Sequence, residues 1–258
     1  MSPSIAFIGR ALRYSPRSVD KDAAIMEAVR QALEAKGLLC LKPVSEEQLS
    51  RLPEADAYVT MGRNMETLRL LAAKEQQGKT VVNPTNSVAL CNHRKLLMRQ
   101  LEQSGIPVPP LMGCEGYWVK RGKGCREADN DVQYAPDFET AEALSKEMNQ
   151  RGVSEVEMRA HVAGFWVKFY GVCNTDFFRS YLVEDGTVRP FQRQDLHKLA
   201  NTAAEQVGLE VYGGDFIVSA TGPVLIDLND WPSFSPCREE AANAIARRVI
   251  DRLTKQES

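Results

Sequence analysis

Apolar runs alternate with amphipathic stretches along the first third of the chain. Each run is short and rich in Val, Ile, Ala or Tyr, whereas each amphipathic stretch repeats apolar residues on one helical face and ends near Gly. The runs predict strands at 4–8, 57–59 and 80–82, and the stretches predict helices at 22–36 and 66–77. Strands and helices that alternate in this way predict an α/β unit over residues 1–84 with a small, mostly parallel sheet.

Beyond residue 84 the pattern becomes richer in strands. A long amphipathic stretch over 87–104, which Gly105 ends, predicts a single helix. Further strands are predicted at 117–121, 155–159, 166–172 and 177–183, and further helices at 139–150, 195–207 and 238–253. This order predicts an α+β region over 85–258.

A hairpin is predicted between Val211 and Pro232, because Ala220-Thr221-Gly222 separates two runs rich in Val, Ile and Leu. Folding the chain about Thr221 gives the opposed pairs Ser219–Pro223, Ile217–Leu225 and Asp215–Asp227. The face predicted to enter the core carries Tyr212, Phe216, Val218, Val224, Ile226 and Leu228.

The other face of this hairpin carries Asp215, Asp227 and Asn229. Two directly opposed carboxylates repel each other, and a divalent cation between them removes that cost. Carboxylate and amide oxygens are hard ligands that suit Mg²⁺, which also holds phosphate oxygens. The alternatives are a solvated face on which the acids splay apart, or a register shifted by one residue.

Composition narrows the class of protein. With 258 residues, 43% of them hydrophobic, the chain can bury a sizeable core, and its net charge of −2 argues against nucleic acid as a partner. We find no apolar run long enough for a membrane span and no signal sequence, so no membrane partner is expected. Six scattered cysteines indicate reduced thiols in a cytoplasmic protein.

Two lysines are placed to meet phosphate groups. Lys95 lies within the predicted helix that follows Asn83-Pro84, and Lys120 ends a predicted strand before the turn Arg121-Gly122-Lys123-Gly124. Lysine acts on phosphate as a point charge, and glycines let backbone N–H groups approach the phosphate oxygens. The alternative for each lysine is a solvated surface charge, and the spacing of a P-loop is absent.

Taken in order, these segments resemble the ATP-grasp superfamily over nearly the whole chain. The motifs that carry the resemblance are Val81-Val82-Asn83-Pro84, the stretch 104–109, Trp118-Val119-Lys120, the hinge stretch 157–164, and the Gly-Gly-Asp hairpin that ends in Ile226-Asp227-Leu228-Asn229. The resemblance implies a fold of α/β and α+β parts, with an N-terminal Rossmann-like pre-ATP-grasp domain at 1–84 and an ATP-grasp domain of two α+β subdomains at 85–258. A lid subdomain is implied at about 112–160.

The same resemblance implies roles for single residues around a bound ATP. Asp215, Asp227 and Asn229 would hold Mg²⁺ and bridge it to the phosphates. Lys95 and Lys120 would neutralise the α- and β-phosphates, and Lys168 is a candidate for the γ-phosphate. The hinge residues implied to bind the nucleotide are Glu157, Arg159, Ala160, His161 and Val162.

The implied activity is an ATP-dependent ligase that joins a carboxylate to an amine through an acyl phosphate. Its acceptor is an anionic small molecule, and Arg193 and Arg238 are candidates to orient a carboxylate or phosphate, unless each forms only a surface ion pair. The shorter Asp227, where similar proteins often have Glu, and the Asp-x-Asn pattern resemble the inositol polyphosphate kinase branch. A kinase acting on a polyol phosphate is therefore an alternative. Phe165 stands where similar proteins have a ribose-binding acid, which leaves a nucleotide-binding module without turnover as a third interpretation.

Overall fold

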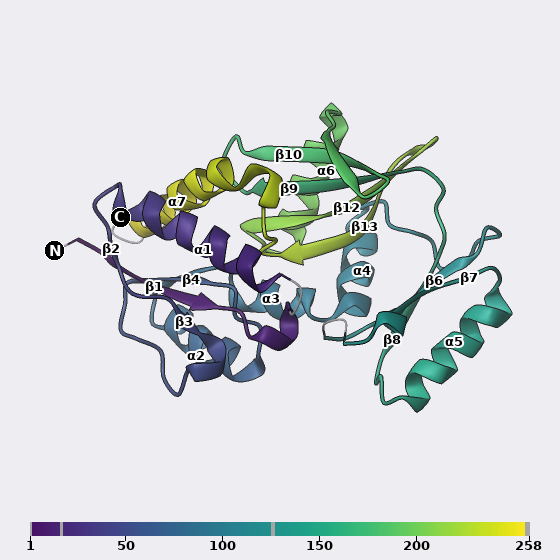
Figure 1. Cartoon of the computed structure of the whole chain (residues 1–258), viewed down its shortest axis with the longest axis horizontal. Coiled ribbons are helices and arrows are strands. Elements are labelled where there is room, and N and C mark those ends of the chain that lie inside the picture. The colour runs from purple at the N-terminus through teal and green to yellow at the C-terminus, as the bar shows by residue number, and fades with distance from the viewer. Residues whose placement is uncertain (1, 16–17, 125–126, 256–258) are drawn as a thin grey trace.

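The computed structural model describes residues 2–15, 18–124 and 127–255 and contains three sheets with helices around them (Figure 1). The first sheet is parallel, in the order β2-β1-β4-β5, and β3 also pairs with β1. Its unit comprises β1 (Ser4–Gly9), α1 (Val19–Glu34), β2 (Leu39–Cys40), β3 (Val44–Ser45), β4 (Ala57–Thr60), α2 (Met65–Gln76) and β5 (Thr80–Val82). The alternating pattern of the first third therefore forms the α/β unit that it predicts.

The second sheet is antiparallel, in the order β11-β10-β9-β12-β13. Its strands are β9 (Phe165–Val172), β10 (Phe178–Glu184), β11 (Thr187–Pro190), β12 (Val211–Ser219) and β13 (Gly222–Asp230). The helices that accompany it are α3 (Thr85–Cys91), α4 (Arg94–Gln103) and α6 (Gln194–Gln206). Phe169, Phe216 and Leu228 from the strands are buried with Leu101 of α4 and Ala200 of α6, so these two helices cover one face of the sheet.

The third sheet is a small antiparallel one, in the order β7-β6-β8, at the far end of the molecule (Figure 1). Its elements are β6 (Tyr117–Arg121), β7 (Val132–Ala135), α5 (Phe138–Gln150) and β8 (Val156–Ala160). Val119, Ala141 and Met148 form a core of their own between the sheet and α5. Because α5 covers that face, the other side of β6 is left to face the second sheet.

The last helix, α7 (Arg238–Thr254), packs against α1 and returns the end of the chain to the first sheet (Figure 1). Ile245 of α7 shares one hydrophobic core with Phe7 of β1 and Val211 of β12. The N-terminal unit and the second sheet are thus held together by apolar packing as well as by the chain connection.

Asn83 fixes this junction through polar contacts. Its Oδ1 accepts hydrogen bonds from the backbone N–H groups of Glu210 and Val211, at 2.8 and 2.7 Å, and its Nδ2 donates to the Val211 carbonyl at 2.7 Å. The side chain is 1% exposed, so it satisfies backbone groups that water does not reach.

Short 3₁₀ helices complete the described chain: η1 (Leu12–Tyr14), η2 (Glu46–Gln48), η3 (Asp129–Asp131) and η4 (Ser235–Cys237). Among the described residues, every helix is too short or too polar to cross a membrane.

The described cysteines (Cys40, Cys91, Cys114, Cys173 and Cys237) are free thiols, and Cys125 lies outside the described residues.

The single helix predicted over 87–104 is wrong, because α3 and α4 are separated at Asn92 and His93. Tertiary hydrogen bonds engage the backbone and side chain at this break. The Asn92 carbonyl accepts from Gly124 N–H at 2.8 Å, and Asn92 Nδ2 donates to the Arg63 carbonyl at 3.2 Å. The helical periodicity of 87–104 does not predict either contact, because both partners are distant in the sequence. The short strands β2, β3, β7 and β11 were also not predicted from the pattern.

The predicted hairpin pairing is right at the acids and wrong nearer the turn. Asp215 pairs with Asp227, but Ser219 pairs with Gly222 and Ile217 with Val224, because the register shifts at a bulge between Asp215 and Phe216. One extra residue on β13 reverses the alternation of the side chains beyond it. Val224 and Ile226 are consequently half-buried, and Leu225 takes the fully buried place predicted for them.

Candidate nucleotide and metal site

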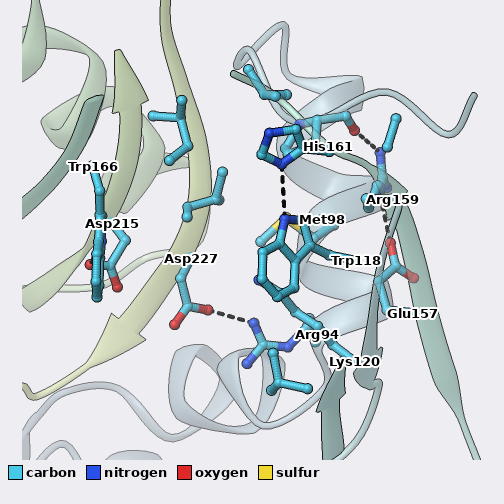
Figure 2. Close-up of a pocket in the computed structure, with 16 residues that line it drawn as sticks. Arg94, Met98, Trp118, Lys120, Glu157, Arg159, His161, Trp166, Asp215 and Asp227 are labelled. Carbon is cyan, nitrogen blue, oxygen red and sulfur yellow. Dashed lines mark hydrogen bonds and ion pairs between the residues drawn. The ribbon is translucent and has the colours of Figure 1, made fainter. Parts of the chain in front are cut away.

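A cavity of about 380 Å³ lies between the second sheet and the small β6–β8 sheet (Figure 2). Asp215, Ile217, Ile226 and Asp227 line it from the hairpin, and Trp118 and Lys120 line it from β6. The remaining lining residues come from α4, β7, β8, β9 and the segments that follow α4 and β8: Arg94, Met98, Pro109, Val132, Glu157, Arg159, Ala160, His161, Val162 and Trp166. The lining residues thus come from segments far apart in the sequence. The charged side chains gather at one end of the cavity, and the apolar side chains at the other.

The polar end is a set of ion pairs around the two aspartates. Arg94 Nη1 donates to Asp227 Oδ1 at 2.7 Å, and Asn229 Nδ2 donates to Asp227 Oδ2 at 3.0 Å. Lys168 Nζ donates to Asp215 Oδ1 at 3.0 Å, and the same oxygen accepts Trp166 Nε1–H at 2.7 Å. Each carboxylate is thus held by its own cation.

These surroundings make the two carboxyl groups unequal. Burial raises the pKa of Asp215 above its ordinary value and repulsion from Asp227 adds to this, although Lys168 opposes the rise. Burial also acts to raise the pKa of Asp227, but Arg94 and Lys120 outweigh it and lower that pKa. The pKa of Lys120 is itself lowered by burial and by the charge of Arg94. Asp227 is therefore the more firmly ionised of the two acids.

The apolar end is built from side chains suited to a flat, weakly polar group. Trp118 Nε1–H donates to His161 Nδ1 at 3.1 Å, which fixes the indole across the cavity (Figure 2). The ring of Tyr134 contacts both residues edge-on, at centroid distances of 5.6 and 5.8 Å. Ile217 and Ile226 face them from the hairpin. Aromatic and aliphatic walls with few polar groups are usual in pockets that bind planar ligands.

The hinge residues predicted to bind nucleotide all line this cavity. Glu157 and Arg159 are buried and bonded to each other, with Arg159 Nε donating to Glu157 Oε1 at 2.7 Å. The backbone N–H groups of Ala160 and His161 are already used, since they donate to the carbonyls of Pro110 and Gly116 at 2.8 Å each.

Solved structures match almost the whole chain, whereas no family model and no curated protein matches it. The RimK domain protein ATP-grasp from Sphaerobacter thermophilus DSM 20745 aligns with a TM-score of 0.71 at 18% identity, over 95% of this chain and 98% of that one. The VanG D-Ala:D-Ser ligase from Enterococcus faecalis aligns with a TM-score of 0.74 at 14% identity, over 98% and 100% of the two chains. The D-alanine–D-alanine ligase from Bacillus anthracis complexed with ATP aligns with a TM-score of 0.71 at 11% identity, over 99% of each chain. This chain has the ATP-grasp fold.

Within this ATP-grasp fold, the cation at the start of α4 that lines the cavity is Arg94 rather than the expected Lys95. Lys95 is exposed and outside the cavity lining. The sequence did contain a signal for Arg94, which precedes the buried Leu97, Met98 and Leu101 by three, four and seven residues and so shares their helical face. Lys120, by contrast, lines the cavity from β6 as expected.

The cations predicted to act on the γ-phosphate or on the acceptor, Lys168, Arg193 and Arg238, lie in different places. Lys168 pairs with Asp215, which lines the cavity, but Lys168 is not itself among the lining residues. Arg193 is exposed at the start of α6, where it pairs with Asp195 at 2.8 Å, and it does not line the cavity. Arg238 begins α7, is also outside the cavity lining, and has a buried Nε without a hydrogen-bond partner among the described residues.

The donor set at the polar end fits Mg²⁺. Asp215 and Asp227 are cross-strand partners whose side chains line the same cavity, and Asn229 is bonded to Asp227. No group of three or more His, Cys, Asp or Glu side chains that could hold a metal exists among the described residues. Two carboxylates and one amide are nonetheless a suitable set, because Mg²⁺ uses one or two protein carboxylates and takes its remaining oxygens from phosphate and water.

Proposed function

We propose that this chain is an ATP- and Mg²⁺-dependent ligase that joins a carboxylate to an amine. The observation that carries the proposal is the opposed pair Asp215–Asp227, placed with Arg94 and Lys120 at one end of a cavity whose other end is apolar. The ATP-grasp fold supports it, and the aligned solved structures include D-alanine–D-alanine ligase and D-Ala:D-Ser ligase.

In this proposal the two ends of the cavity bind different parts of ATP. Trp118, Ile217 and Ile226 enclose the adenine, beside the hinge backbone near Ala160 and Val162. Arg94, Lys120 and Lys168 would neutralise the phosphates, and Asp215, Asp227 and Asn229 would hold Mg²⁺, which would supply further positive charge beside the phosphates. Arg94 takes the role first expected of Lys95.

The acceptor is proposed to bind where the N-terminal unit, as a pre-ATP-grasp domain, meets the end of β13. A second cavity of about 370 Å³ lies within the N-terminal unit at the carboxyl end of β1 and is lined by Arg10 and Asp22, which pair at 3.4 Å. Arg10 Nη2 also donates to the Trp231 carbonyl at 2.8 Å, directly after β13. The guanidinium of Arg10 supplies the positive charge that an acceptor carboxylate requires. The unpartnered Nε of Arg238 makes that residue a second candidate. Arg193 is disfavoured, because it is exposed and lines neither cavity.

The proposed ligase reaction would proceed in two steps. A carboxylate oxygen of the acceptor forms a bond to the γ-phosphorus of ATP, and ADP leaves. The amine then attacks the acyl carbon, phosphate leaves, and the amine proton passes to solvent.

A polyol or inositol phosphate kinase is the second candidate, favoured by the Asp-x-Asn pattern of Asp227 and Asn229. A ligase releases phosphate only when carboxylate and amine are both present, whereas a kinase needs a single hydroxyl acceptor. A module without turnover is the third candidate, since Phe165 is 62% exposed and brings no ribose-binding carboxylate to the cavity. ATP consumption with any acceptor pair excludes it.

The first experiment is calorimetric titration with a nonhydrolysable ATP analogue, with and without Mg²⁺. We expect Mg²⁺-dependent binding to the wild type and a loss of at least about tenfold, equivalent to about 1.4 kcal/mol, in Asp227→Ala. Asp251→Ala, an exposed position on α7 outside the nucleotide cavity, is the matched control and should bind as the wild type does. No binding by folded wild-type protein at millimolar nucleotide would overturn the proposal.

A further inference from the structure

Both proposed metal carboxylates are already engaged by cations in this structure. The two oxygens of Asp227 accept from Arg94 and Asn229, and Oδ1 of Asp215 accepts from Lys168 and Trp166. A divalent cation that enters alone must displace these groups or bind next to their positive charges. Like charges a few ångströms apart in a partly buried site repel strongly, so either course weakens its binding.

Arg94 is placed to move away from Asp227. It is the first residue of α4, its side chain is 28% exposed, and it reaches Asp227 with Nη1 only. Its Nε is buried and has no hydrogen-bond partner among the described residues. A guanidinium with an unused donor, facing a cavity that also holds Lys120, is well suited to take a phosphate oxygen in exchange for a carboxylate.

We propose that Arg94 couples metal binding to nucleotide binding by exchanging Asp227 for a phosphate group. This inference rests on the proposed nucleotide site and concerns its order of loading. Without nucleotide, Arg94 holds Asp227 and keeps the divalent cation out. When a nucleoside triphosphate arrives, its phosphates draw Arg94 away, and Asp227 becomes available to the metal that accompanies the phosphates.

If this coupling exists, replacing Arg94 should have opposite effects on the binding of a divalent cation alone and of nucleotide alone. The coupling can therefore be tested. Removing the charge of Arg94 frees Asp227 and should strengthen the binding of a divalent cation alone. The same change removes a phosphate partner and should weaken the binding of nucleotide without metal. A residue that served only to hold the fold together would weaken both.

The variants are Arg94→Met, which keeps most of the side-chain length, and Arg94→Gln as a second form should the first not fold. Lys95→Met is the matched control, because it removes the same charge from the next residue, which is exposed and outside the cavity. The probes are Mn²⁺ alone, followed by electron paramagnetic resonance of the free ion, and a nonhydrolysable ATP analogue in EDTA, followed by calorimetry.

We expect Arg94→Met to bind Mn²⁺ alone at least tenfold more tightly than the wild type and the metal-free analogue at least tenfold more weakly. Lys95→Met should change either constant by less than twofold. Mn²⁺ binding that is unchanged or weaker in folded Arg94→Met and Arg94→Gln would overturn the coupling. A wild-type titration with the analogue and Mg²⁺ keeps the two proposals apart, since its failure overturns the nucleotide site itself.

Discussion

Replacing Asn83 by Ala tests how the N-terminal unit is joined to the second sheet. The change deletes three buried hydrogen bonds, of 2.7 to 2.8 Å, to the backbone of Glu210 and Val211. The Val211 carbonyl keeps a second donor, Trp231 N–H at 3.3 Å, so the groups left without a partner are the two N–H groups. Asn83 is 1% exposed, and a side chain shortened to a methyl group leaves little room for water to replace the amide.

The expected loss follows from these two N–H groups. A buried donor left unsatisfied costs about 1–3 kcal/mol, so Asn83→Ala should lower the free energy of unfolding by about 2–6 kcal/mol. That is a large part of the roughly 5–15 kcal/mol by which a protein of this kind is stable. Asn243→Ala is the matched control, since Asn243 is exposed on α7 and bonds only to the carbonyl one turn earlier, so its effect should stay within about 0.5 kcal/mol.

Urea unfolding followed by circular dichroism measures both variants under the same conditions. A lower midpoint with an unchanged slope identifies a loss of stability rather than a change in the unfolded chain. If Asn83→Ala lost less than about 1 kcal/mol, the two N–H groups would have found other partners, and the role assigned to Asn83 would be wrong.

Three further predictions concern the hairpin, the cavity and the first sheet. A Cβ at Gly214 would lie 2.1 Å from the Asp227 carbonyl, so Gly214→Ala should displace Asp227 and abolish Mg²⁺-dependent analogue binding in calorimetry, whereas Gly9→Ala, with its nearest atom at 3.7 Å, should leave binding intact. Nucleotide should alter the fluorescence of Trp118 and Trp166, which line the cavity, so Trp118→Phe and Trp166→Phe should each reduce the signal change and Trp231→Phe should not; an equal response of all three variants would contradict the placement of the nucleotide. Hydrogen bonds from the Ser4 backbone N–H, the Lys79 ammonium and the Ser4 hydroxyl lower the pKa of Asp56 from 3.8 to about 2, so its contribution to stability is complete above pH about 4 and is lost as the pH falls through about 2. The free energies of unfolding of the wild type and Asp56→Asn should therefore differ at pH 6 and converge near pH 2, and a difference that persists at pH 2 would contradict this cause.

Some residues of the cavity could not be predicted from the sequence. Periodicity located the helix that carries both Arg94 and Lys95, but the choice between them depends on which face of α4 is buried and on the break at Asn92 and His93. The break depends on partners at Arg63 and Gly124, which are distant along the chain. Likewise Trp166 has no pattern that links it to Asp215, because their contact exists only once β9 and β12 are paired.

By itself, the sequence determined the parallel α/β unit, the strand-rich region after it and the opposed pair Asp215–Asp227, because all three follow from local periodicity and a nearby turn. Only the tertiary structure decided the bulge that places Ile226 and Asp227 together in the cavity, the return of α7 to the first sheet, and the cation that each aspartate holds. The physical reason is the distance along the chain over which each feature is determined. Alternation along a strand or helix is a property of neighbouring residues, whereas a bulge, an interface and an ion pair depend on groups that the folded chain brings together from distant positions.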